Sequence, residues 1–261
     1  MTAAAFVSSY GQPRRAGAPT VVLIHGAGMD HTVWALQGRY LAFHGWNALA
    51  VDLPGHGRSR ELPPLASIED TADWLAMLVA QAGPAPATLV GHSMGALAAL
   101  ATAARHPGRV AGLCLMGAAA RMPVHPELLA LAAAHDAKAV ELMCDWAFGP
   151  RGRIGGNPHP GGWLQGMARA LLRCGDPAAL SVDLAACNAY VAGPAHAAAI
   201  RCPALVVVGA ADRMTPPKAG RQLAGSIPGA VTASIDGAGH MMMVEASDAC
   251  LTALRNFLPA C

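Results

Sequence analysis

Charged and aromatic residues are scarce in this chain of 261 residues, at 13% and 5%, whereas hydrophobic residues make up 54%. The net charge is only +2 and no long basic patch is present, which argues against a nucleic-acid partner. No uninterrupted apolar run reaches the roughly 18 residues of a membrane helix, and the first residues lack the charged and apolar regions of a secretory signal. We therefore expect a cytoplasmic protein without a membrane or nucleic-acid partner.

Paired cysteines are also missing. The seven cysteines are odd in number and show neither a CxxC pair nor a metal-ligand spacing. This distribution suits free thiols in a reducing compartment, and we expect no metal site. We also expect no cofactor. The high apolar content indicates a sheet buried on both faces and an apolar surface, part of which could form a contact in a homo-oligomer.

Short apolar runs alternate with helical segments along most of the chain. The runs predict strands near 20–25, 47–52, 87–92, 110–116, 203–208 and 230–235. The helical segments lie near 32–43, 67–81, 94–105, 217–226 and 245–258. This alternation predicts an α/β protein with a mostly parallel, doubly wound sheet. With a further short strand from Phe6 to Tyr10, we expect about seven or eight strands.

The motif Gly91–Gly95 is a Gly-x-Ser-x-Gly turn between an apolar run and a helical segment rich in small residues. Ser93 is therefore predicted to lie at a tight bend where a strand meets a helix. The helix start offers free N–H groups and the positive end of the helix dipole. The turn indicates a nucleophilic serine, although a strand–helix connection without chemistry can have the same pattern.

A nucleophilic serine needs a base and a carboxylate that orients the base. Asp212 follows the apolar run 204–211, at the edge of a parallel sheet where catalytic groups gather, although it could instead cap the next helix. His240 lies in a glycine-containing loop directly after the last predicted strand. The order Ser93, Asp212, His240 is one in which such triads occur.

The loop His25–Gly28 supplies a fourth element, because its small residues let backbone N–H groups face a carbonyl under attack. We expect the N–H groups of Ala27 and Met94 to bind the oxyanion of the tetrahedral intermediate.

Together these motifs resemble the α/β-hydrolase fold family, in the subgroup with a serine nucleophile and a small helical lid. The resemblance covers nearly the whole chain and rests on residues 25–28, 51–59, 91–95, 209–212 and 237–240. It is most similar to carboxylesterases, enol-lactonases and carbon–carbon bond hydrolases. Haloalkane dehalogenases and most epoxide hydrolases of this family carry an aspartate at the position of Ser93, which disfavours those activities.

The resemblance divides the chain into a hydrolase core of residues 1–119 and 201–261 and a helical lid insertion of residues 120–200. Within the lid, residues 149–162 are too rich in Gly and Pro for regular structure and form either a mobile flap or a surface loop. Arg151 and Arg153 in this segment could steer a carboxylate or be simply solvated. The candidate substrate-binding residues are His25, Gly26, His92, Trp146, Trp163 and Met241.

We expect an enzyme, a serine hydrolase that cleaves a small ester, lactone or related carbonyl compound through an acyl-enzyme at Ser93. One alternative is a lyase or carbon–carbon bond hydrolase with the same triad. The other is a non-catalytic small-molecule receptor on the hydrolase fold.

Overall fold

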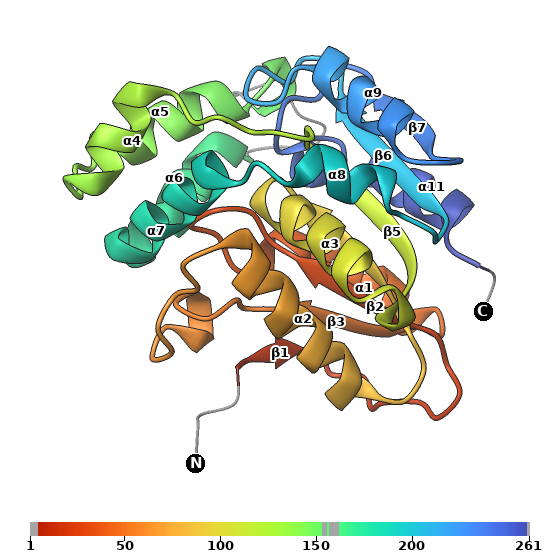
Figure 1. The fold of residues 1–261 in the computed structure, drawn as a ribbon. Helices are drawn as coiled ribbons and strands as arrows, with labels where there is room; N and C mark the ends of the chain where they lie inside the picture. Colours follow the sequence, from red (N-terminus) through yellow and green to blue (C-terminus); the bar gives the residue numbers. More distant parts are fainter. Residues whose placement is uncertain (1–4, 153–155, 157–161, 260–261) are drawn as a thin grey trace.

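The computed structural model describes residues 5–152, 156 and 162–259. Within these residues one sheet of seven strands has the order β1-β3-β2-β4-β5-β6-β7 (Figure 1). The strands are β1 Val7–Ser8, β2 Thr20–Ile24, β3 Asn47–Val51, β4 Ala87–His92, β5 Val110–Met116, β6 Ala204–Gly209 and β7 Val231–Ile235. Strand β1 is antiparallel to β3, and every other described pairing is parallel. The predicted α/β fold with a mostly parallel sheet is confirmed.

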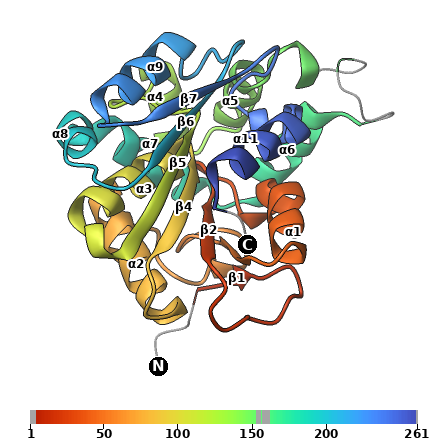
Figure 2. The same ribbon diagram turned by 90° about the vertical axis from the view of Figure 1, so that its right-hand side faces the viewer.

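Helices cover both faces of the sheet. Their bounds are α1 Ala35–Phe43, α2 Ile68–Ala82, α3 Met94–Arg105, α4 Pro126–Ala133, α5 Lys138–Ala147, α6 Leu164–Cys174, α7 Pro177–Ala189, α8 Gly193–Ala198, α9 Pro217–Ser226, α10 Met242–Glu245 and α11 Ser247–Phe257. Four 3₁₀ turns are also described, η1 His31–Trp34, η2 Gly57–Ser59, η3 Pro107–Arg109 and η4 Pro150–Gly152. Figure 2 shows α2, α3, α8 and α9 on one face, and α1 and α11 on the other.

The central strands are buried because both faces are covered. Every residue of β4 and of β6 is buried, as their continuous apolar runs predict for a parallel sheet. The edge strand β7 is mostly exposed. The strand predicted from Phe6 to Tyr10 is reduced to two residues, and Tyr10 has a φ of 55° that ends the extended chain.

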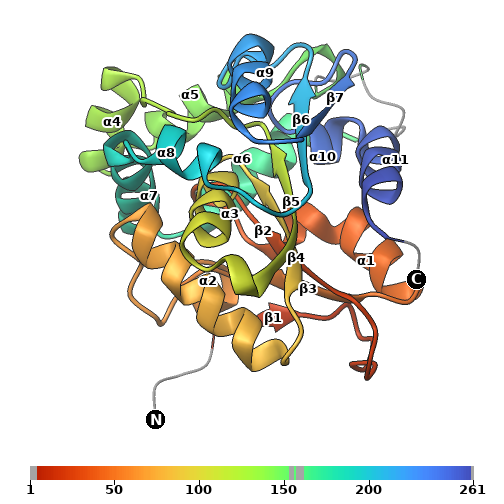
Figure 3. The same ribbon diagram turned by 45° about the vertical axis from the view of Figure 1, so that its right-hand side comes forward.

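Helices α4 to α7 follow one another in the sequence between β5 and β6 (Figure 3). In the fold, α4 packs on α5 and α7, and α5 packs on α6. The two ends of this insertion meet, because a Cβ on Gly193 would overlap the carbonyl oxygen of Ala120. Helix α8 packs on the core helix α3, so we propose that the lid ends near residue 192 and not at 200. Among the described residues no helix is both long and apolar enough to cross a membrane.

Candidate active site

Ser93 lies at the bend between β4 and α3 with φ 54° and ψ −118°, a conformation that is strained for a residue other than glycine. Its N–H donates to the carbonyl oxygen of Met116 over 2.9 Å, which holds the bend on the neighbouring strand. A Cβ at Gly91 would overlap the backbone at Gly95, and a Cβ at Gly95 would overlap the carbonyls of residues 24 and 25. The two glycines therefore allow the close packing on which this bend depends.

His240 and Asp212 form a buried pair. His240 Nδ1 donates to Asp212 Oδ2 over 2.9 Å, which leaves Nε2 as the nitrogen that can accept a proton. Burial raises the pKa of Asp212, but the charge and hydrogen bond of His240 outweigh it and hold the pKa below its ordinary value. Asp212 is thus an ionised partner that fixes the imidazole tautomer.

Thr215 is a third member of this cluster that the sequence analysis missed. Its hydroxyl donates to Asp212 Oδ2 over 2.6 Å and lies 3.1 Å from His240 Nδ1. Asp212 Oδ1 also accepts the N–H groups of Met214 and Thr215, each over 2.9 Å. Asp212 therefore shapes the turn before α9 and contacts the histidine as well, but it does not cap α9, whose N-cap residue is Pro216.

The His240 loop is bound to the insertion. The N–H of His240 donates to the carbonyl oxygen of Ala147 at the end of α5 over 2.7 Å. The buried carboxylate of Glu245 accepts the N–H groups of Gly149 over 2.8 Å and of Gly239 over 3.0 Å. Burial raises the pKa of Glu245 to about 7. The sequence analysis did not predict this bridging role of Glu245.

Ala27 and Met94 present the N–H groups expected for an oxyanion hole. Met94 begins α3, so its N–H has no partner within the helix. In the part of the chain that the structure describes, the N–H of Ala27 has no acceptor either. A Cβ at Gly26 would lie 3.3 Å from the Cβ of Ser93, which places this loop directly beside the nucleophile.

The insertion also holds the loop His25–Gly28. Asp183 on α7 accepts the N–H of Gly28 and the Nε2–H of His56 on the same oxygen, each over 2.8 Å. Burial alone would lower the pKa of His56, but the buried carboxylate of Asp183 raises it above its ordinary value. Asp183 therefore joins the insertion to the loop that carries Ala27.

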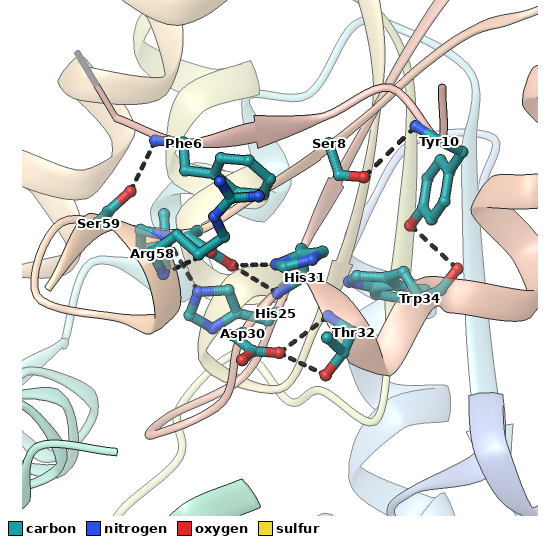
Figure 4. A network of polar contacts seen from close by, with 12 residues as sticks. Phe6, Ser8, Tyr10, His25, Asp30, His31, Thr32, Trp34, Arg58 and Ser59 are labelled. Atoms are coloured by element: carbon teal, nitrogen blue, oxygen red, sulfur yellow. Dashed lines mark hydrogen bonds and ion pairs between the residues drawn. The ribbon is translucent and has the colours of Figure 1, made fainter. Parts of the chain in front are cut away.

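A second network holds η1, which follows this loop, from the side of β3 (Figure 4). Asp52 accepts the backbone N–H of His31 and the His31 ring over 2.7 Å, and the N–H of Arg58 over 2.8 Å. The guanidinium of Arg58 lies 4.0 Å from the ring centre of Phe6. Asp30, His31 and Asp52 bring ligand atoms within 4.8 Å of one another, but Asp52 is already hydrogen-bonded at both oxygens and so acts as a brace.

A cavity of about 600 Å³ opens at this site, and Ser93 and His240 both lie in its wall. Most of the other lining residues are apolar and come from the insertion, among them Met143, Leu172 and Leu184. No carboxylate lies among the described lining residues, whereas Arg121 and Arg213 do. The cavity is therefore an apolar chamber with positive charge at its wall.

The structure separates the candidate substrate-binding residues into two groups. Gly26, His92, Trp146 and Met241 line the cavity. His92 donates from Nε2 to the carbonyl oxygen of His240 over 2.9 Å, and burial lowers its pKa to about 3, so it is a neutral wall residue.

The prediction that His25 and Trp163 contact substrate is corrected, because neither is among the described residues of the cavity wall. Both ring nitrogens of His25 are occupied: Nδ1 contacts the carbonyl oxygen of Gly26 at 2.8 Å, and Nε2 accepts the N–H of Leu53 over 3.1 Å. Trp163 is 44% exposed and packs beside Arg169.

The structure describes only part of the predicted flap, residues 149–162. Residues 153–155 and 157–161, which include Arg153, lie outside the described residues. Arg151 lies beside Gly237, where a Cβ would be 3.1 Å from its Nε, and it does not line the described cavity. The arginines at the cavity are Arg121 and Arg213 instead.

Fold and site together define a class of enzyme, the hydrolases that attack a carbonyl carbon with a serine at a strand–helix bend. Residues 21–253 match the model of the alpha/beta hydrolase family. The chain belongs to this family.

The relatives are enzymes that hydrolyse esters and lactones. The chain is 36% identical over 244 residues to a pimeloyl-[acyl-carrier protein] methyl ester esterase of Chromobacterium violaceum, covering 90% of each chain. It resembles the enol-lactonase from Burkholderia xenovorans LB400 at a TM-score of 0.82 and 27% identity, over 97% of this chain and 94% of the other. A thermophilic esterase from Thermogutta terrifontis matches at 0.79 and 27%, over 91% and 88%. The protein is a serine hydrolase that acts on ester or lactone bonds.

Proposed function

We propose that this protein is a carboxylesterase that hydrolyses a small ester through an acyl-enzyme at Ser93. The observation that carries this proposal is the arrangement at one cavity of a strained serine, a histidine whose Nδ1 is bound by a buried carboxylate, and two backbone N–H groups that have no acceptor among the described residues. Relatives named as methyl ester esterases support an ester with a small alcohol as the first substrate class to test.

Each group has one role in the proposed mechanism. His240 takes the proton of Ser93 as the hydroxyl attacks the ester carbonyl, and later gives it to the leaving alkoxide. Asp212 keeps Nδ1 protonated and stabilises the imidazolium, while the N–H groups of Ala27 and Met94 bind the oxyanion. Water then attacks the acyl-enzyme with His240 as base, which releases the acid and restores Ser93.

The test combines trapping with substitution. We expect a fluorophosphonate probe to label the wild-type protein at Ser93, and Ser93→Ala to lose labelling and to lower kcat by about 10⁴–10⁶-fold on small methyl and p-nitrophenyl esters. Unchanged folding by circular dichroism is the control. Residual activity of a tenth of wild type in a clean preparation would refute the assignment.

Lactone opening is the second candidate, because a structure of similar fold is an enol-lactonase. The same triad opens a lactone by the same attack, so a series of lactones belongs in the substrate panel. Turnover without any trapped acyl-enzyme would favour the lyase or carbon–carbon cleavage alternative. Binding of a small molecule without turnover of any ester or lactone would favour a receptor.

We further propose that the enzyme works in the cytoplasm. The cysteines among the described residues are all free thiols, which suits a reducing compartment. The homo-oligomer and the absence of nucleic-acid and membrane partners remain predictions.

A further inference from the structure

We infer that Arg121 and Arg213 form an anion-binding rim of the cavity that selects esters carrying a free carboxylate. This inference rests on the proposed function, because it names the substrate class of the same site. The two arginines belong to segments that were not singled out from the sequence, and the structure brings them to one place.

Their position follows from the sheet. Arg121 comes shortly after β5, and Arg213 directly follows Asp212, just after β6. Strands β5 and β6 are parallel neighbours, with Leu113 paired to Ala204 and Met116 to Val207. Both arginines therefore leave the sheet at the same carboxyl edge, which is where the cavity opens, and both line it.

Both side chains are exposed and uncommitted. Among the described residues, neither guanidinium has an ion-pair partner within 4.0 Å or a hydrogen-bond acceptor. By contrast, Arg105 pairs with Asp73, and Arg169 and Arg173 pair with Glu141. Each free guanidinium offers five N–H donors in a planar fork that matches a carboxylate.

The rest of the cavity leaves this charge unopposed. No acid lies among the described lining residues, and the buried carboxylate of Asp212 is already bound by His240 and Thr215. Apolar walls exclude water and concentrate the positive potential at the mouth. A neutral substrate gains nothing from this arrangement, whereas a carboxylate gains charge-assisted hydrogen bonds.

The substrate class is therefore a monoester of a dicarboxylic acid. The ester carbonyl lies at Ser93, a short apolar chain contacts walls such as Met143 and Leu184, and the free carboxylate meets Arg121 and Arg213. Hydrolysis consumes one water, breaks the acyl C–O bond, and releases the diacid and the alcohol.

The experiment compares two methyl esters of equal length, one ending in a carboxylate and the other in a primary amide. The measured quantity is the ratio of their kcat/KM values, which cancels any general damage near the triad. We expect Arg121→Met and Arg213→Met each to lower this ratio about three- to fivefold at low salt, the size of an exposed ion pair, and the double variant about tenfold or more. High salt should lower the wild-type ratio in the same direction.

The chain supplies a matched control for each arginine. Arg109 and Arg201 are exposed and lie before β5 and β6, at the opposite edge of the sheet. Arg109→Met and Arg201→Met make the same change in net charge away from the cavity, and we expect both to leave the ratio as in wild type. An equal drop in these controls, or an unchanged ratio in the Arg121/Arg213 double variant, would overturn the inference.

A binding measurement separates this inference from the proposed function. The Ser93→Ala variant cannot turn over, so calorimetry compares its affinity for adipate with that for adipamide. We expect adipate to bind more tightly, and the preference to vanish when Arg121 and Arg213 are also replaced. Equal affinities would refute the anion-binding rim even if the wild-type protein cleaves esters. A preference for adipate in a protein that cleaves no ester would support the rim and refute the proposed carboxylesterase activity.

Discussion

Replacing Asp183 with alanine should loosen the contact between the insertion and the oxyanion loop. One oxygen of Asp183 accepts both the N–H of Gly28 and the Nε2–H of His56, and both the carboxylate and the imidazole are buried. Removal of one partner of a buried pair leaves the other uncompensated and costs about 3–5 kcal/mol. His56 can relieve part of this cost by losing its proton, so we expect about 3 kcal/mol, or a fall in Tm of about 10 °C.

Activity should fall as well, and mainly in kcat. Ala27 is next to Gly28, and in the proposed mechanism its N–H binds the oxyanion that forms only in the transition state. We expect Asp183→Ala to lower kcat about tenfold with a smaller change in KM. Asp183→Asn can keep an oxygen at the same place, so it should retain both hydrogen bonds, lose the charge, and cost only about 1 kcal/mol.

The stability difference should depend on pH with a defined sign. The pKa of His56 is raised in the folded protein, so the protonated pair stabilises most below the ordinary value of 6.5, and this contribution is lost as the pH rises through the folded pKa. Urea unfolding at pH 5.5 and at pH 9 measures it for wild type and Asp183→Ala. Asp176→Ala is the control on the same helix, because Asp176 only caps α7, with a cost of about 1 kcal/mol and no change in kcat. If Asp183→Ala matched Asp176→Ala in both stability and kcat, the reasoning would be wrong.

Two further predictions concern the acids around His240. Asp212→Asn should lower kcat by about 10⁴-fold, because it favours the wrong imidazole tautomer. Asp236 is exposed, so Asp236→Asn should leave kcat nearly unchanged. If steady-state assays gave the reverse result, Asp236 and not Asp212 would be the acid that orients His240. For Glu245, whose pKa is raised to about 7 from 4.5, the folded state holds the proton more tightly than the unfolded state, so wild-type stability falls as the pH rises through this range. Between pH 5 and pH 8, the free energy of unfolding of Glu245→Gln should rise relative to that of wild type by up to about 3 kcal/mol, because each pKa unit corresponds to about 1.4 kcal/mol. Urea titrations measure this difference, and parallel pH curves for the two proteins would contradict the prediction.

The sequence by itself determined the fold class and the elements that carry Ser93, Asp212 and His240. Apolar runs of strand length that alternate with helical segments can bury both faces only in a parallel sheet between helices, and the observed β4 and α3 have the predicted bounds. The glycines around Ser93 and the loops of Asp212 and His240 could be placed because their signals are local: a motif, a strand end and a turn. Such features can be predicted because each depends mainly on residues that are close by in the sequence.

Only the tertiary structure decided which side chains serve the site from a distance. Asp183 meets Gly28 across 155 residues and Glu245 meets Gly149 across 96, and no periodicity or spacing encodes such contacts. The same holds for Arg121 and Arg213, which the pairing of β5 and β6 brings to one rim in place of Arg151. His25 was wrongly expected in the pocket for a related reason, because a motif fixes where a residue lies along the chain, whereas the packing around it decides which atoms remain free.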